Sequence, residues 1–189
     1  QELKDAYTEH EIKVLCSLAF CHLLHCTNIE IHLKKHEFLE KSFIDKFVQV
    51  VEELKTDKPI QYILGETEFA GIDFQLNSET LIPRPETEEL VMWIVESGVR
   101  PGARVLDIGT GSGCIIVSLG KLLKGGRFYG VDISPEAVRQ AADNARRNGV
   151  EVDFEVRDIL HYGEWEWPGF DVIVSNPPYV RESEREFMH

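Results

Sequence analysis

Apolar residues recur at helical spacing in the first 60 positions of the chain. Between residues 9 and 26 they stand three or four positions apart, which is the period of one face of an α-helix. A second stripe of this period runs from residue 37 or 42 to residue 55 and ends before Pro59. We therefore expect residues 1–58 to form a small helical domain. The residues of the two stripes are Ile12, Leu15, Leu18, Ala19, Leu23 and Cys26, then Phe43, Phe47, Val50, Val51 and Leu54.

The pattern changes after Pro59, where apolar residues are interleaved with Gly65, Gly71 and polar side chains. This alternation predicts two β-strands, and we expect residues 59–80 to be a β-hairpin linker. Prolines, acidic residues and a threonine follow at positions 83–88, which is typical of a helix N-terminus. The apolar positions after them predict a helix to about residue 97.

Strand and helix patterns alternate from residue 104 onwards. Strands are predicted at 104–108, 127–132, 152–156 and 170–175, and helices at 114–123 and 135–148. Such alternation is the pattern of a parallel sheet with helices on both faces. We therefore expect an α/β fold in residues 81–189, preceded by the helical domain and the hairpin linker.

The net charge of the chain argues against some classes of binding partner. The formal charge is −13, and residues 1–60 carry 11 acidic and 8 basic side chains against 22 and 12 in residues 61–189. An extended DNA or RNA footprint is disfavoured, because nucleic-acid affinity depends largely on Lys and Arg. No apolar run approaches the roughly 18 residues of a membrane helix. Four cysteines without a leader peptide indicate a reduced, cytoplasmic setting.

The first candidate site is a glycine-rich segment between a predicted strand and a predicted helix. Glycines at such a junction let the backbone turn sharply, so that the amides of the helix start face a ligand. The spacing is G-x-G-x-G, because Cys114 replaces the last glycine of a dinucleotide fingerprint. A tight turn without a ligand is the alternative. The candidate residues are Asp107, Gly109, Thr110, Gly111, Ser112 and Gly113.

Two acidic residues follow later strands of the predicted sheet. Asp132, before Ile133, ends a strand at the position where a carboxylate can accept hydrogen bonds from both ribose hydroxyls of a nucleoside. Capping the next helix is its alternative role, for which Ser134 is better placed. Asp158 follows the third strand, where it could accept from the exocyclic amine of adenine, with Ile159 beside the ring. A solvated turn acid is an equal alternative for Asp158.

The most specific motif is Asn176-Pro177-Pro178-Tyr179, which follows a strand of apolar residues. Ligands of open α/β sheets bind at this carboxyl edge. The two prolines have fixed φ angles and no N–H groups, so the loop is a rigid row of carbonyl acceptors beside the Asn176 amide. A plain turn has no need of the tyrosine, and the motif therefore favours a binding site.

With these motifs, the chain resembles the HemK-type methyltransferases that modify a glutamine of peptide chain release factors. The glycine-rich segment and the Asn-Pro-Pro-Tyr motif alone are typical of amino-methyltransferases that use S-adenosylmethionine. Residues 81–88, Leu-Ile-Pro-Arg-Pro-Glu-Thr-Glu, and residues 61–65, Gln-Tyr-Ile-Leu-Gly, narrow the resemblance to this family. It covers residues 59–180, whereas residues 1–58 match in character rather than in motif.

The resemblance implies a Rossmann-like class I methyltransferase sheet and methyl transfer from S-adenosylmethionine to the side-chain amide nitrogen of a glutamine in a Gly-Gly-Gln motif, with S-adenosylhomocysteine as product. Asn176 and the Pro177 carbonyl would accept the two N–H groups of that amide, and Tyr179 would form a flat wall against it. Pro178 and Arg84 are further expected substrate contacts. No metal is required, because the methyl donor is already activated. Release factors are the implied partners.

Two other functions stay open on the residues alone. An adenine N6-methyltransferase of DNA or RNA also uses Asn-Pro-Pro-Tyr, although the acidity of residues 61–189 argues against it. A nucleotide-sensing domain without catalysis would keep the glycine-rich loop but has no use for Asn176 and Tyr179. The segment Cys21-His-Leu-Leu-His-Cys26 does not place its four polar side chains on one helix face, which favours ordinary helix residues over a metal site.

The number of residues after the last predicted strand limits how many strands the sheet can have. Only ten residues follow Tyr179, and the sheet of the HemK-type family has more strands than are predicted here. The resemblance therefore implies that the sheet is incomplete in residues 1–189. Because parallel sheets are normally covered on both faces, the last strand should leave apolar surface and edge groups exposed.

Overall fold

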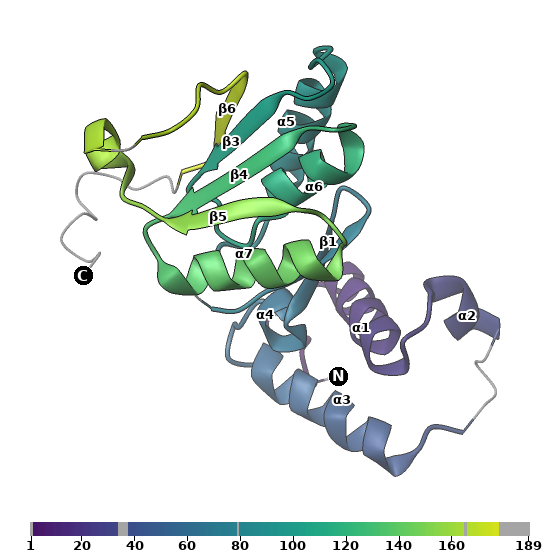
Figure 1. Cartoon of the computed structure of the whole chain (residues 1–189). Coiled ribbons are helices and arrows are strands. Elements are labelled where there is room, and N and C mark those ends of the chain that lie inside the picture. Colours follow the sequence, from purple (N-terminus) through teal and green to yellow (C-terminus); the bar gives the residue numbers. More distant parts are fainter. Residues whose placement is uncertain (1, 34–37, 79, 165, 178–189) are drawn as a thin grey trace. The chain divides into compact units, whose positions relative to one another are not determined.

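The computed structural model describes residues 2–33, 38–78, 80–164 and 166–177 (Figure 1). The chain divides into two compact units, one of residues 1–66 and one of residues 67–189. Each unit contains a cluster of buried apolar side chains. Each therefore has a hydrophobic core of its own.

The first unit is helical, as its apolar periodicity predicts. Its described residues form α1 (Glu9–Leu24), α2 (Asn28–Leu33), α3 (Lys41–Leu54) and α4 (Ile60–Leu64). A capping box starts α1: the Thr8 hydroxyl accepts from the Glu11 N–H, and the Glu11 carboxylate accepts from the Thr8 N–H. The core of this unit consists of Leu3, Ala19, Val50, Leu54 and Ile60.

The short elements of the first unit differ from the sequence prediction. Residues 60–64 were expected in the hairpin but form α4, which ends at Gly65 with a φ of 72°, a left-handed C-cap that suits glycine. The six-residue helix α2 was not predicted, because a helix of this length shows no periodicity. The start of α3 at Lys41 agrees with the later of its two predicted starts; the earlier one, Glu37, lies outside the described residues.

The second unit is an α/β fold with a parallel sheet, which confirms the predicted fold class. The strands β1 (Glu66–Phe69) and β2 (Ile72–Gln75) form the predicted hairpin. The parallel strands lie in the order β5-β4-β3-β6. The remaining elements, in chain order, are α5 (Pro85–Glu96), β3 (Arg104–Ile108), α6 (Cys114–Leu122), β4 (Arg127–Asp132), α7 (Pro135–Arg147), β5 (Val152–Val156), the 3₁₀-helix η1 (Ile159–Glu164) and β6 (Val172–Ser175).

One face of the parallel sheet is covered by α5, α6 and α7. The three helices pack in sequence, α5 against α6 and α6 against α7, and their core with the strands includes Val91, Val105 and Phe128. On the opposite face, the rings of Trp167 and Phe170 pack against Tyr129. The predicted α-helices on both faces are therefore wrong for the described residues of this unit, where the second face carries this aromatic cluster instead.

The strand β6 is the last strand of the sheet on its side. It pairs with β3, and within the described residues no strand pairs with its other edge. The Ile173 side chain is 62% exposed and borders an apolar hollow with Leu90 and Trp93. Among the helices of the described residues, none is both long and apolar enough to cross a bilayer.

Candidate active site

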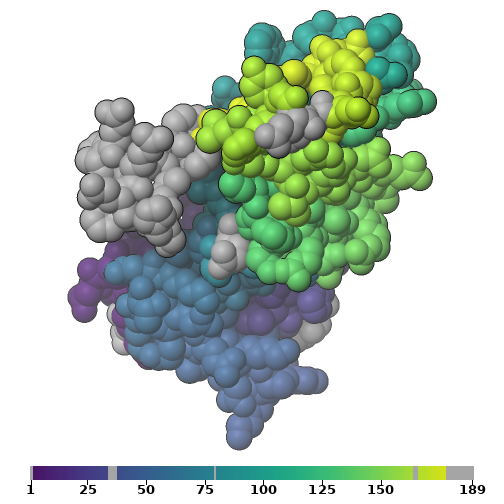
Figure 2. All heavy atoms as spheres, turned by 60° about the vertical axis from the view of Figure 1, so that its left-hand side comes forward, coloured from purple at the N-terminus to yellow at the C-terminus, as the bar shows by residue number. Residues whose placement is uncertain are grey.

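A pocket of about 660 Å³ opens at the carboxyl edge of the parallel sheet. The chain runs from β3 through β4 to β5 in one direction and then returns to place β6 on the other side of β3. Such a reversal of strand order separates the loops above it, which makes it the usual ligand site of open α/β sheets. In the space-filling view, the yellow-green residues after β5 form one continuous surface with β5 and α7 (Figure 2).

The glycine-rich loop connects β3 to α6 at the floor of this pocket. Gly109, Gly111 and Gly113 have φ angles of 71°, 54° and 79°, in the left-handed region that favours glycine. The amides of Gly109 and Thr110 donate to the Val131 carbonyl at the end of β4. A Cβ at position 113 would lie 3.0 Å from the Cβ of Ala141. The third glycine therefore lets α6 start directly against α7.

Asp132 ties this loop to the next helix. Its Oδ2 atom accepts from the Gly111 N–H over 2.9 Å, and its Oδ1 atom accepts from the Ser134 N–H over 3.0 Å. The cap of α7 is the Ser134 side chain, which accepts from the Ala137 N–H. The expectation that Ser134 and not Asp132 caps this helix is thus confirmed. Asp132 is also one of the residues that line the pocket.

Asp107 lies beneath the loop and is fully buried. Its Oδ2 atom accepts a hydrogen bond from the Thr110 hydroxyl over 2.8 Å, whereas its Oδ1 atom has no hydrogen-bond partner among the described residues. Burial raises the pKa of the Asp107 carboxyl to about 7; the Thr110 hydrogen bond opposes this shift, and the nearby Asp132 charge adds to it. Asp107 therefore supports the loop from below as a carboxyl that is easily protonated.

The wall opposite the loop follows β5. Asp158 and Ile159 both line the pocket, and so does Arg157. Asp158 accepts from the Leu160 N–H over 2.9 Å and pairs with His161. Part of its hydrogen-bonding capacity is therefore used within the turn that contains it. Arg157 pairs with Glu155, so this wall combines an apolar side chain, a carboxylate and an arginine whose charge is balanced by a neighbouring acid.

The residues after β6 close the pocket. Asn176 and Pro177 both line it, and the preceding residue, Ser175, is anchored by a hydrogen bond from its hydroxyl to the Ile108 carbonyl over 2.7 Å. The Nδ2 atom of Asn176 donates to the hydroxyl of Thr87 over 3.0 Å. Pro178 and Tyr179 of the same motif lie outside the described residues.

The pocket unites many, but not all, of the predicted site residues. Thr110, Ser112 and Gly113 lie in or under the loop without lining the pocket, and the first two are buried. Arg84 is exposed at the start of α5 and is not among the lining residues. The residues brought together are Gly109, Gly111, Asp132, Ile133, Asp158, Ile159, Asn176 and Pro177.

Sequence reasoning missed several neighbours of the site. Thr80 and Leu81 line the pocket, as do Arg157 and Leu160, and Thr87 contacts Asn176. The segment 81–88 carried a signal, because its composition stands out from an ordinary helix start. Leu160 could not be found from the sequence, since a single apolar residue between predicted elements has no distinctive pattern.

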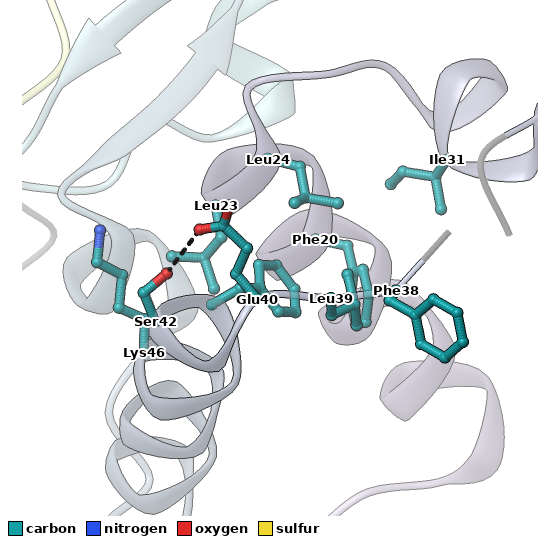
Figure 3. Close-up of a pocket in the computed structure, with 10 residues that line it drawn as sticks. Phe20, Leu23, Leu24, Ile31, Phe38, Leu39, Glu40, Ser42 and Lys46 are labelled. Carbon is teal, nitrogen blue, oxygen red and sulfur yellow. Dashed lines mark hydrogen bonds between the residues drawn. The ribbon is translucent and has the colours of Figure 1, made fainter. Parts of the chain in front are cut away.

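A second hollow, in the helical unit, contains none of these motifs (Figure 3). It is lined mainly by Phe20, Leu23, Leu24 and other apolar side chains of α1 to α3. Within the described ranges, no group of three or more His, Cys, Asp and Glu side chains could hold a metal ion. Cys114 in the second unit is buried, which raises the pKa of its thiol to about 12, as befits a packing residue.

Both units match models of known protein families. The family model for the PrmC N-terminal domain matches residues 1–65, and a model for a methyltransferase domain matches residues 100–185. A release factor glutamine methyltransferase of Flavobacterium psychrophilum is 39% identical over 193 residues, covering all of this chain and 67% of the relative. One from Bacteroides thetaiotaomicron is 40% identical over 189 residues, with the same coverage.

Likeness to solved structures is more distant. The tRNA (uracil-54, C5)-methyltransferase of Pyrococcus abyssi, solved with S-adenosyl-L-homocysteine, is 24% identical with a TM-score of 0.49. The match covers 60% of this chain and 28% of that one.

Proposed function

The chain belongs to the release factor glutamine methyltransferase family, and from this membership we propose how its site performs the reaction. The enzyme transfers a methyl group from S-adenosylmethionine to the side-chain amide of a release factor glutamine, and S-adenosylhomocysteine is the product. We propose that the pocket at the carboxyl edge of the sheet holds the cofactor. Asn176 and Pro177, on its rim, then hold the glutamine of a Gly-Gly-Gln motif.

The chemistry of the pocket fits S-adenosylmethionine. The ligand is a nucleoside with a sulfonium cation and an amino acid tail, and the lining offers the carboxylates of Asp132 and Asp158 between apolar walls. Each Asp132 oxygen accepts one backbone N–H. A carboxylate has about four lone-pair sites, so capacity is left for the ribose hydroxyls. A volume of about 660 Å³ is of the size that small-molecule ligands occupy.

Ile133 and Ile159 supply the apolar part of the cofactor site. Their side chains are 68% and 37% exposed and both line the pocket. Exposed isoleucines beside a carboxylate suit an adenine ring, which needs flat apolar contact and a polar partner for its amine. When bound, the cofactor supplies an activated methyl group, so the remaining task of the protein is to bring the acceptor into line.

The acceptor nitrogen needs orientation rather than deprotonation. Its lone pair is delocalised into the glutamine carbonyl, which makes it a poor nucleophile. Acceptance of its two N–H groups by the Asn176 side-chain oxygen and the Pro177 carbonyl would hold the nitrogen at a fixed place and angle, the kind of positioning that lowers a barrier by several kcal/mol. Tyr179 and Pro178 remain proposed substrate contacts, with Tyr179 as a flat wall for the amide, and Arg84 is a proposed contact outside the pocket.

One observation carries this proposal. Asn176 and Pro177 line the same pocket as the glycine-rich loop and Asp132, so the residues proposed for the acceptor and those proposed for the donor share one cavity. The cytoplasm, where release factors act, is the proposed location.

The proposal is tested by measuring which molecule receives the methyl group. We expect the full-length enzyme with labelled S-adenosylmethionine to label a release factor, and a variant with the Gly-Gly-Gln glutamine replaced to stay unlabelled. Asn176→Ala should lower the rate by about 100-fold or more, since positioning supplies most of the catalysis, while cofactor affinity changes little. Label on an adenine-containing oligonucleotide instead, or a near wild-type rate for Asn176→Ala, would refute the proposal.

A further inference from the structure

The hydroxyl of Thr87 lies against the amide of Asn176, although 89 positions separate the two residues in the sequence. Thr87 stands in the first turn of α5, where its N–H donates to the Arg84 carbonyl, and it is 6% exposed. We propose that Thr87 is a positioning residue of the methyl transfer, which holds the Asn176 side chain in the orientation that receives the glutamine. The inference rests on the role proposed for Asn176 above.

The side chain of Asn176 ends in a primary amide with an oxygen and a nitrogen. They have nearly the same shape but opposite hydrogen-bonding character, since the oxygen accepts and the nitrogen donates. When the Asn176 oxygen accepts from the substrate, its NH₂ group needs an acceptor of its own, because an unpaired donor in a partly buried place is costly. The Thr87 Oγ1 atom is such an acceptor, 3.0 Å from Nδ2.

The reverse orientation of Asn176 is unproductive. A half turn of the amide would present its nitrogen to the N–H groups of the substrate amide, which places donor against donor. A hydroxyl can donate as well as accept, so Thr87 fixes the place of the amide, and the N–H groups of the substrate select the orientation in which Nδ2 donates to Thr87 Oγ1 and the Asn176 oxygen faces them. Preorganisation of this kind removes a cost that would otherwise appear in the transition state.

The surroundings of both residues make the contact rigid. Pro85 is the first residue of α5, and its fixed φ sets the start of the helix that carries Thr87. On the other side, the Ser175 hydroxyl is bonded to the Ile108 carbonyl, which anchors the residue before Asn176 to the end of β3. The segment 81–88 thus contacts the proposed acceptor site through the Thr87 hydroxyl. This contact gives Thr87 a proposed chemical role in addition to its place at the start of a helix.

The experiment compares Thr87→Val with Thr87→Ser in the full-length enzyme. Valine keeps the shape of threonine without the hydroxyl, whereas serine keeps the hydroxyl. We expect Thr87→Val to lower kcat by about tenfold, as for the loss of a partner of a buried donor, with the dissociation constant of S-adenosylhomocysteine and the unfolding temperature close to wild type. Thr87→Ser should restore most of the rate. Ser118→Ala, which removes another buried hydroxyl of this unit, is the matched control and should match wild type.

Three results would overturn the inference. The first is a kcat within twofold of wild type for Thr87→Val. The second is equal impairment in the valine and serine variants, which would assign the effect to packing. The third is a loss of S-adenosylhomocysteine affinity as large as the loss of rate, which would make Thr87 part of the cofactor site. Failure of the proposed function is distinguishable, because the wild-type enzyme would then leave the release factor glutamine unlabelled.

Discussion

Asp132 holds the glycine-rich loop in place and is also the residue proposed to bind the ribose of the cofactor. Its two oxygens hold the amides of Gly111 and Ser134, and its side chain lines the pocket. A change at this position therefore removes a proposed ribose partner together with the tether of the loop. Either loss weakens binding, and neither requires the sheet to unfold.

We predict that Asp132→Ala weakens the binding of S-adenosylmethionine by about 1–3 kcal/mol, as expected for hydrogen bonds to a charged acceptor. Titration calorimetry on the purified protein measures this directly. Asp143→Ala is a suitable control, because Asp143 is on the exposed side of α7 and pairs with Arg146. An unchanged affinity in Asp132→Ala would exclude Asp132 from the site.

Asp107 links stability to pH. In the unfolded chain its carboxyl has the ordinary pKa of 3.8, whereas burial raises the pKa to about 7 in the folded protein. Between these two values the folded state binds the additional proton, so the contribution of Asp107 to stability falls as the pH rises through this window. Above pH 7 the buried charge is a constant cost, because both states are then ionised.

We predict that Asp107→Asn reduces this pH dependence. Asparagine can still accept from the Thr110 hydroxyl but cannot ionise, so the variant should gain unfolding temperature over wild type by about 5 °C at pH 8 and by much less at pH 4. Thermal unfolding of both proteins across this range provides the measurement. A difference that does not change with pH would show that Asp107 is not the group responsible.

The residues of the site were predictable to the extent that their local sequence constrains the backbone. A tight turn is predicted by the three glycines Gly109, Gly111 and Gly113, because glycine is favoured where φ is positive. A rigid loop is predicted by the two consecutive prolines, because proline fixes φ and has no N–H. Thr87 could not be assigned in this way. Its partner is distant in sequence, and a threonine near a helix start is common for reasons unrelated to catalysis.

At the level of elements, a row of amides on α7 holds the hairpin strand β2. Asn144 is fully buried; it accepts from the Gln75 N–H and donates to the carbonyls of Gln75 and Ser112. Gln140 and Asn148, four positions to either side, donate to the Gln75 and Asp73 carbonyls. Residues four apart share a helix face, so one face of α7, continued by its C-cap residue Asn148, satisfies main-chain groups of β2.

We predict that Asn144→Ala costs about 2–3 kcal/mol of unfolding free energy, because it removes three hydrogen bonds to main-chain groups of the partly buried Gln75 and the buried Ser112. Asn148→Ala, on the same face but less buried, should cost about 1 kcal/mol or less. Urea unfolding of the two variants gives the comparison. Equal losses would show that the central position of Asn144 does not matter.

The longer elements were predictable because their periods are clear. The strands β3, β4 and β5 have the predicted bounds, and α7 ends one residue before its predicted end. The helices that the pattern failed to predict are α2, α4 and η1, each of six residues or fewer. A turn and a half of helix cannot show a repeat of 3.6 residues, so only the flanking residues, such as Pro59 and Gly65, carried information.

For the whole molecule, the separate cores have a thermodynamic consequence. The helical unit and the sheet unit each bury their own apolar cluster, and the described residues that line the proposed cofactor pocket all belong to the second unit. We predict two calorimetric transitions, of which S-adenosylhomocysteine at 100 times its dissociation constant stabilises only one, by about 2.7 kcal/mol. A single transition that shifts as a whole would contradict this.

The outer edge of β6, which no other strand of the described residues pairs with, affects how the chain behaves at high concentration. Its four residues present main-chain donors and acceptors beside the exposed side chains of Trp93 and Ile173, and such an edge is a template for pairing with another copy. Proline has no N–H to offer to a neighbouring strand. Pro177 therefore limits strand pairing at this edge to the residues before it, so the loop proposed to hold the substrate also sets the length of the segment that could pair with another strand.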